Sequence, residues 1–171
     1  MTKIAIVSDS HFKSDLLSEA IEHLKSLGCE AVIHCGDFQT LENMQILHNC
    51  ALPYVSVFGN NDYELLEYQG NFKIYKEPHY FKIGESKCKM MHLPYYLTPD
   101  TDFVFFGHTH QFETYKKEDT IFINPGEICA RNKPVSECAM LEIKSDCYII
   151  NHYYKHPSDN NYETKEYKYE K

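Results

Sequence analysis

The chain has 171 residues and a formal net charge of −8, with 17 basic residues against 25 acidic ones. This length is about that of one domain and is sufficient to bury a core of its own. The acidic balance argues against nonspecific binding to nucleic acid or to an anionic membrane, since both call for a basic surface.

The cysteines and the first residues indicate a cellular compartment. Seven cysteines, an odd number, occur without a Cys-x-x-Cys pair or a zinc-finger spacing, which favours reduced and buried thiols. The chain begins with a strand-like segment and shows neither the apolar region of a signal peptide nor a stretch of membrane-spanning length. We therefore expect a soluble, cytoplasmic protein that does not insert into a membrane.

The first half of the chain alternates strand-like and helical patterns. Apolar periodicity predicts, in this order, a strand, a helix, a strand, a helix and a strand over residues Ile4–Val7, Leu16–Leu27, Ala31–Cys35, Thr40–His48 and Tyr54–Phe58. Gly28 is placed to end the first helix, and Pro53 precedes the third strand. Such alternation is typical of βαβ units, so we expect a parallel sheet with right-handed crossovers.

After Pro78 the pattern changes to short strands and tight turns. The strands are expected over residues Tyr80–Ile83, Lys87–Met91, Phe103–Phe106, Ile121–Ile123, Cys138–Lys144 and Tyr148–Tyr154. We expect one domain over residues 1–155. Residues 156–171 are polar and show no clear periodicity, so they are expected to form a solvated tail, with an oligomer contact or a strand extension as alternatives.

Five of the apolar runs end at residues that can bind a divalent metal ion. These residues are Asp9 and His11, then Asp37, then Asn60, then His92, and finally His108 and His110. In open α/β sheets, ligands bind outside the carboxyl ends of the strands, so these side chains are expected to converge on one site. Carboxylate, amide oxygen and imidazole together suit Mn, Fe or Zn. The set is large enough for a pair of metals that share one carboxylate.

The same residues form a series of motifs. Asp9-Ser10-His11, Gly36-Asp37, Gly59-Asn60-Asn61-Asp62, His92 and Gly107-His108-Thr109-His110 follow one another in this order. Together they resemble the motifs of the calcineurin-like metallophosphoesterase superfamily, over about residues 1–150. The size of the chain and the later Asn124-Pro125-Gly126 are most similar to the small prokaryotic phosphodiesterases of the YfcE type.

The resemblance implies both a fold and a ligand set. The fold is of the α/β class, a four-layer αββα sandwich of two mixed β-sheets flanked by helices, with a dinuclear metal site at one end. One metal would be held by Asp9, His11, Asp37 and His110, and the other by Asp37, Asn60, His92 and His108, so that Asp37 is the bridge. The residues implied in catalysis are Asp37, Asn60, Asn61, Asp62 and His92.

The resemblance also implies a reaction. Two divalent ions, Mn²⁺ first and Fe, Ni or Zn as alternatives, would activate a bridging hydroxide for in-line attack on a phosphodiester. The expected substrate is a small-molecule or nucleotide phosphodiester rather than a monoester, because a chain of this size leaves little room for a substrate-specific cap. A homo-oligomer is a possible assembly.

Three positions depart from the family pattern. Asn61 stands where many relatives have His, and an amide cannot deliver a proton to the leaving group. Leu93 follows His92 where many relatives have Gly, which predicts a reshaped loop. Glu127 follows Asn-Pro-Gly where Ser is commoner, and Arg131 is either a surface residue or a contact to substrate phosphate.

Two other functions were compared with the enzyme. A noncatalytic scaffold is the main alternative, because one relative in this branch, the small retromer subunit of eukaryotic endosomes, uses the fold for protein assembly. All seven ligand positions carry a competent side chain here, which favours catalysis. A metal-dependent amidohydrolase would need a barrel of typically about 250 residues and an opening His-x-His motif, and neither is present.

Overall fold

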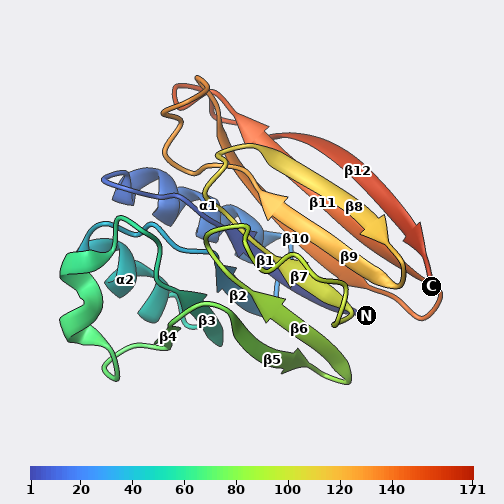
Figure 1. The fold of residues 1–171 in the computed structure, drawn as a ribbon. Coiled ribbons are helices and arrows are strands. Elements are labelled where there is room, and N and C mark those ends of the chain that lie inside the picture. The colour runs from blue at the N-terminus through green and yellow to red at the C-terminus, as the bar shows by residue number, and fades with distance from the viewer.

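The computed structural model describes residues 1–171, which form two stacked β-sheets (Figure 1). The seven-stranded sheet contains β1 (Thr2–Val7), β2 (Ala31–His34), β3 (Tyr54–Val57), β4 (Ile74–Tyr75), β10 (Ser136–Ile143), β11 (Cys147–Lys155) and β12 (Glu163–Glu170). The five-stranded sheet contains β5 (His79–Ile83), β6 (Ser86–Met90), β7 (Phe103–Phe105), β8 (Phe112–Lys117) and β9 (Thr120–Pro125).

Both sheets are mixed. In the larger one the order is β12-β11-β10-β1-β2-β3-β4, and the four strands from β1 to β4 run parallel to one another. In the smaller one the order is β5-β6-β7-β9-β8, and β6, β7 and β9 are parallel. The strands that precede the candidate ligands therefore lie next to each other in two parallel groups.

The helices are α1 (Ser14–Ser26), α2 (Leu41–His48) and a 3₁₀ helix over Tyr63–Tyr68. In α1 the apolar side chains fall on one buried face, and Gly28, with a φ of 86°, follows its end. The α2 helix begins at a cap in which the hydroxyl of Thr40 accepts a hydrogen bond of 3.2 Å from the backbone N–H of Asn43. No helix is both long and apolar enough to cross a membrane.

Two apolar cores hold the layers together. The first lies between the sheets, where isoleucines of β1 and β2 meet aromatic and branched residues of β7 and β9: Ile4, Ile6, Ile33, Phe103, Phe105, Ile121 and Ile123. The second lies between the seven-stranded sheet and the helices, and includes Ala5, Val7, Leu17, Ile21, Met44 and Leu47. Because β1 is buried on both faces, it reads as a continuous apolar run.

The two mixed sheets of the expected sandwich are confirmed, but the helices cover only one outer face. All three helices lie within the first 68 residues, in the blue to green part of Figure 1, and Leu65 of the 3₁₀ helix shares the core of α1 and α2. The outer face of the five-stranded sheet carries a small buried cluster around Phe106, against which Leu97 and Tyr115 pack. The second helical layer is therefore not formed, because the second half of the chain contains only strands and loops.

The final segment is not a solvated tail. Residues 163–170 form β12, which pairs antiparallel with β11 and gives the larger sheet its edge (Figure 1). Tyr167 and Tyr169 alternate with charged residues and pack against the core between the sheets, and the Tyr169 hydroxyl donates to Thr114 Oγ1 at 3.1 Å. The strand extension, expected only as an alternative, is what the structure contains, because two tyrosines at a spacing of two suffice to anchor an edge strand.

Candidate metal centre

Strands from both sheets deliver the seven candidate ligands to one place. Asp9 and His11 follow β1, and Asp37 and Asn60 follow β2 and β3 of the same sheet. His92 follows β6, and the His108–His110 pair follows β7 in the other sheet. The ligand loops of the two sheets are in direct contact, because His92 Nδ1 lies 2.8 Å from the carbonyl oxygen of Cys35, just after β2.

The backbone at the ligands is strained. Five of the seven residues have a positive φ, namely Asp9 (54°), His11 (46°), Asp37 (61°), His108 (69°) and His110 (59°). A residue other than glycine in this region costs about 1–3 kcal/mol and persists only where its surroundings hold it, most often at functional sites. One such restraint is Asn43 of α2, whose amide donates to the carbonyl oxygen of His11.

Two glycines let the ligand loops approach each other closely. A Cβ atom on Gly59 would lie 2.1 Å from Asp37 Oδ1 and 2.3 Å from the backbone nitrogen of Asp37. A Cβ atom on Gly107 would lie 2.2 Å from Ser8 Oγ and 3.0 Å from Asp9 Oδ2. Both positions therefore accept only glycine unless the ligand loops move apart.

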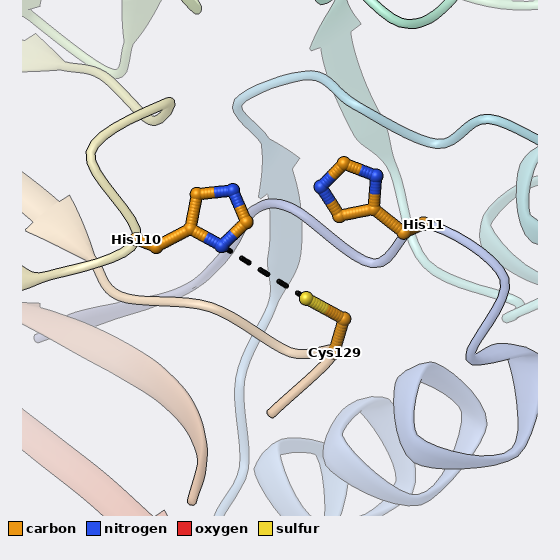
Figure 2. Close-up of side chains that lie close together, drawn as sticks. All are labelled: His11, His110 and Cys129. Atoms are coloured by element: carbon orange, nitrogen blue, oxygen red, sulfur yellow. Dashed lines mark hydrogen bonds between the residues drawn. The ribbon is translucent and has the colours of Figure 1, made fainter. Parts of the chain in front are cut away.

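The first group of ligands consists of Asp9, His11, Asp37 and His110, all buried. His11 Nε2 is 3.6 Å from Asp37 Oδ2, and His110 Nε2 is 3.3 Å from Asp9 Oδ1. The imidazole rings of His11 and His110 face each other with their centroids 5.3 Å apart (Figure 2). Asp9 Oδ1 and His11 Nε2 are buried without a hydrogen-bond partner. Since unpartnered buried polar atoms are costly, these convergent donors fit a bound cation.

The second group shares Asp37 with the first. His92 Nε2 lies 3.4 Å from Asp37 Oδ2 and 3.0 Å from Asn60 Oδ1. His108 Nδ1 lies 3.1 Å from the same oxygen of Asn60. Asn60 and His108 are exposed, whereas His92 is buried. The second group therefore forms the solvent-facing edge of the site.

Hydrogen bonds to the far side of three imidazoles determine which nitrogen faces the site. The Cys35 carbonyl can only accept, so Nδ1 of His92 carries a proton, and Nε2 is the nitrogen that a metal ion can bind once its own proton is displaced. Nδ1 of His11 is 2.7 Å from Gln39 Oε1, and Nδ1 of His110 contacts Glu127 Oε2. Such outer contacts are typical of metal-binding histidines, because they set the tautomer and the orientation of the ring.

Charge is distributed unequally among the buried groups. Burial raises the pKa of Asp9. Burial also opposes ionisation of Asp37, but the hydrogen bonds from His92 and Asn61 and the charge of His92 outweigh it and hold the pKa of Asp37 well below its usual range. The pKa of His92 is raised to about 9 despite its burial, because Asp37 and Asp9 stabilise the imidazolium. The positive charge of the protonated His92 thus balances the carboxylates of the site. A bound metal ion would take the place of the proton on His92 Nε2.

The motif residues Asn61 and Asp62 contact Asp37 in different ways. The backbone N–H of Asn61 donates to Asp37 Oδ1 at 2.9 Å, and its side-chain amide donates to Oδ2 at 2.7 Å. The carboxylate of Asp62 accepts the backbone N–H groups of Asp37, Gln39 and Gly59, at 2.9, 2.7 and 2.7 Å. Asp62 therefore braces two ligand loops through their backbones.

Three further residues belong to this site, Gln39, Glu127 and Cys129, and none of them was assigned a role there from the sequence. Figure 2 shows Cys129 beside His110, with 3.9 Å between the sulfur and Nδ1. Burial and the charge of Glu127 raise the pKa of the Cys129 thiol to about 12. Its sulfur nevertheless lies within reach of a cation held by His11 and His110. The available signal was the position of Glu127 directly after Pro125-Gly126, at the end of a strand, with Cys129 two residues further along.

Replacing Glu127 by Gln is expected to weaken Mn²⁺ binding about 10–100-fold, the usual effect of losing an outer partner of a metal ligand. The Glu127 carboxylate is buried, and hydrogen bonds from His110, Lys133, Cys129 and Asn132 outweigh its burial and lower its pKa. Calorimetric titration with Mn²⁺ measures the effect. Glu113→Gln, the same change at an exposed position of β8, is the control. Equal affinities in the two variants would exclude a role for Glu127 in orienting His110.

Comparisons with known proteins identify the family of the chain and relatives of its fold. Residues 2–146 match the family model of the calcineurin-like phosphoesterase superfamily domain. Phosphodiesterase MJ0936 of Methanocaldococcus jannaschii is 28% identical over 159 residues, which cover 85% of this chain and 96% of that protein. The crystal structure of a Vps29 single mutant from Entamoeba histolytica has a TM-score of 0.77 at 23% identity and covers 98% of this chain and 99% of its own. The phosphoesterase YfcE of E. coli has a TM-score of 0.69 at 18% identity, with 86% and 91% covered.

Proposed function

Because the chain belongs to the calcineurin-like phosphoesterase superfamily, we propose that it is a dinuclear metal-dependent phosphodiesterase that hydrolyses its substrate by in-line attack of hydroxide. The observation that carries the proposal is the position of Asp37. A single oxygen, Oδ2, lies 3.6 Å from His11 Nε2 and 3.4 Å from His92 Nε2, so it faces both groups of ligands. A carboxylate in this place can be shared by two cations.

Each group offers a donor set that suits a divalent ion. The first would use Asp9, His11, Asp37 and His110, and the second Asp37, Asn60, His92 and His108. When bound, two such ions polarise phosphoryl oxygens and supply hydroxide at neutral pH, so that no side-chain nucleophile is needed. Nitrogen and oxygen donors favour Mn²⁺, with Fe, Ni or Zn as alternatives.

The protein's own residues shape the reaction around this pair. The exposed Asn60 and His108 leave the second group open, so that a phosphodiester can approach from solvent. Asn61 donates to Asp37 and offers no proton for the leaving group. Cleavage is therefore expected to favour leaving groups that depart as stable anions. A small-molecule or nucleotide diester fits this open edge.

A noncatalytic scaffold explains the site less well. The likeness to Vps29 lies below 25% identity and shows the shared fold alone. A scaffold has no need for the unpartnered Asp9 Oδ1 and His11 Nε2 in its interior, nor for five strained ligand residues.

We also propose that the protein is located in the cytoplasm, because all seven cysteines are free and buried, as is usual in reducing compartments.

The test of this function is metal-dependent turnover. The protein, stripped of metal and reloaded with Mn²⁺, is expected to contain two ions per chain and to hydrolyse bis-p-nitrophenyl phosphate faster than p-nitrophenyl phosphate. Activity should disappear in chelator and return with Mn²⁺, because the site's chemistry depends on the cations. Failure of every divalent metal to support cleavage of either ester would rule out the enzyme and leave the scaffold.

A further inference from the structure

Arg131 is the only arginine in a chain that otherwise uses lysine, and its side chain reaches the metal centre. Its Nη2 lies 3.3 Å from His110 Nε2, the nitrogen that faces the first group of ligands. The residue is exposed, so its guanidinium approaches the site from solvent. A fixed positive charge thus stands at the entrance to the candidate metal centre.

The backbone on both sides of Arg131 is held in place. Before it, the N–H of Cys129 donates to the carbonyl oxygen of Asp9 at 3.1 Å, and Ala130 has a φ of 51°. After it, the N–H groups of Asn132 and Lys133 both donate to Glu127 Oε1, at 2.8 and 2.9 Å. The loop is therefore tied to a metal ligand at one end and to the partner of His110 at the other, which restricts the space that the Arg131 side chain can reach.

The charge of Arg131 calls for an anionic partner. No carboxylate forms a salt bridge with it, and Glu127, the nearest acid along the chain, is engaged with His110, Cys129 and two backbone N–H groups. A guanidinium beside a bound divalent cation would be repelled by it. An anion bound between the guanidinium and the divalent cation offsets this repulsion. A phosphoryl group is such an anion, and the planar fork of arginine binds it with better geometry than the point charge of lysine does.

We propose that Arg131 is a catalytic residue that binds a nonbridging phosphoryl oxygen of the substrate beside His110 and stabilises the negative charge of the transition state. This inference rests on the proposed phosphodiesterase function. Because arginine stays protonated at all relevant pH values, Arg131 stabilises charge but delivers no proton. Neither Arg131 nor Asn61 can act as a general acid. The rate of cleavage should therefore still depend on how stable the leaving group is as an anion.

The test compares Arg131→Ala and Arg131→Lys with the parent protein, all loaded with Mn²⁺. Calorimetric titration with inorganic phosphate should show that Arg131→Ala raises the Kd about tenfold or more, the effect of losing one charge-assisted hydrogen bond. Its kcat on bis-p-nitrophenyl phosphate should fall about 10²–10³-fold, as when one donor to a developing oxyanion is removed. Arg131→Lys should recover part of both losses.

Two controls separate this role from a structural one. Lys117→Ala removes an exposed cation from β8 and should change neither phosphate binding nor turnover. The affinity of Arg131→Ala for Mn²⁺ should be at least that of the parent, because the guanidinium repels the bound cation. Parental phosphate binding in Arg131→Ala, or a loss of Mn²⁺ affinity as large as the loss of phosphate affinity, would overturn the proposal. A parent protein that binds phosphate through Arg131 but cleaves no ester would refute the phosphodiesterase function and the catalytic role, and would leave Arg131 as an anion ligand only.

Discussion

Replacing Asp37 by Asn is expected to remove both metal ions and to lower turnover at least about 10³-fold, since a bound cation contributes several kcal/mol and each 1.36 kcal/mol is a factor of ten. Oδ2 of Asp37 faces His11 in one group and His92 in the other, so an amide nitrogen at that position disrupts both. Replacing His108 or His110 by Ala should affect one ion more than the other, because each imidazole belongs to one group.

Elemental analysis of the Mn²⁺-loaded proteins measures this directly. Asp119→Asn, at an exposed turn, is the matched control and should retain two ions per chain and full activity. Thermal unfolding without metal shows whether Asp37→Asn still folds, since Asn61 loses its charged acceptor. An Asp37→Asn protein with two tightly bound ions and near-normal turnover would refute the shared carboxylate.

The second large effect is expected from a single methyl group. In Gly59→Ala the new Cβ would meet Asp37 at its carboxylate oxygen and at its backbone nitrogen, at 2.1 and 2.3 Å. Backbone atoms cannot rotate away as a flexible side chain would, so the loop carrying Asp37 must shift. We expect loss of both ions, as in Asp37→Asn, and a destabilisation of about 1–3 kcal/mol, the usual cost of overpacking.

Metal content and thermal unfolding of the two alanine variants test this expectation. Gly70→Ala is the control, because Gly70 has a φ of 98° but no heavy atom within 4 Å of its ideal Cβ position. It carries backbone strain without a clash, so it should lower stability and leave Mn²⁺ binding intact. If Gly59→Ala bound two ions with parental affinity, Asp37 would not need its present position.

Local patterns were enough to predict most of the elements. The helical spacing of leucines and the stop at Gly28 predicted α1, and the continuous apolar run of β1 reflects its burial on both faces. β4 and β8 were missed for different reasons. β4 is only two residues long, and β8 has a largely exposed, polar face that weakens its alternation. Short or half-solvated strands carry too few apolar residues for periodicity to be detected.

The chemistry of the site was also readable from the sequence, because a ligand directly after a strand lies at the sheet edge where ligands bind. The types of side chain and their order are visible in residues next to strand ends, whereas the choice of Asp37 as the shared carboxylate came from the resemblance of the motifs to the superfamily. The proposal that these residues bind two metals does not depend on the coordinates, although the distances at Asp37 support it.

Only the tertiary structure showed what supports these residues. Glu127 and His110 are 17 positions apart, and their contact exists because the loop after β9 folds back against the loop after β7. The contact of Arg131 with His110 exists because Arg131 lies on the same loop after β9. The edge position of β12 likewise depends on pairing with β11 and on two tyrosines that find a core between the sheets. Contacts between distant segments are set by how the layers pack, and this information lies in no single stretch of the sequence.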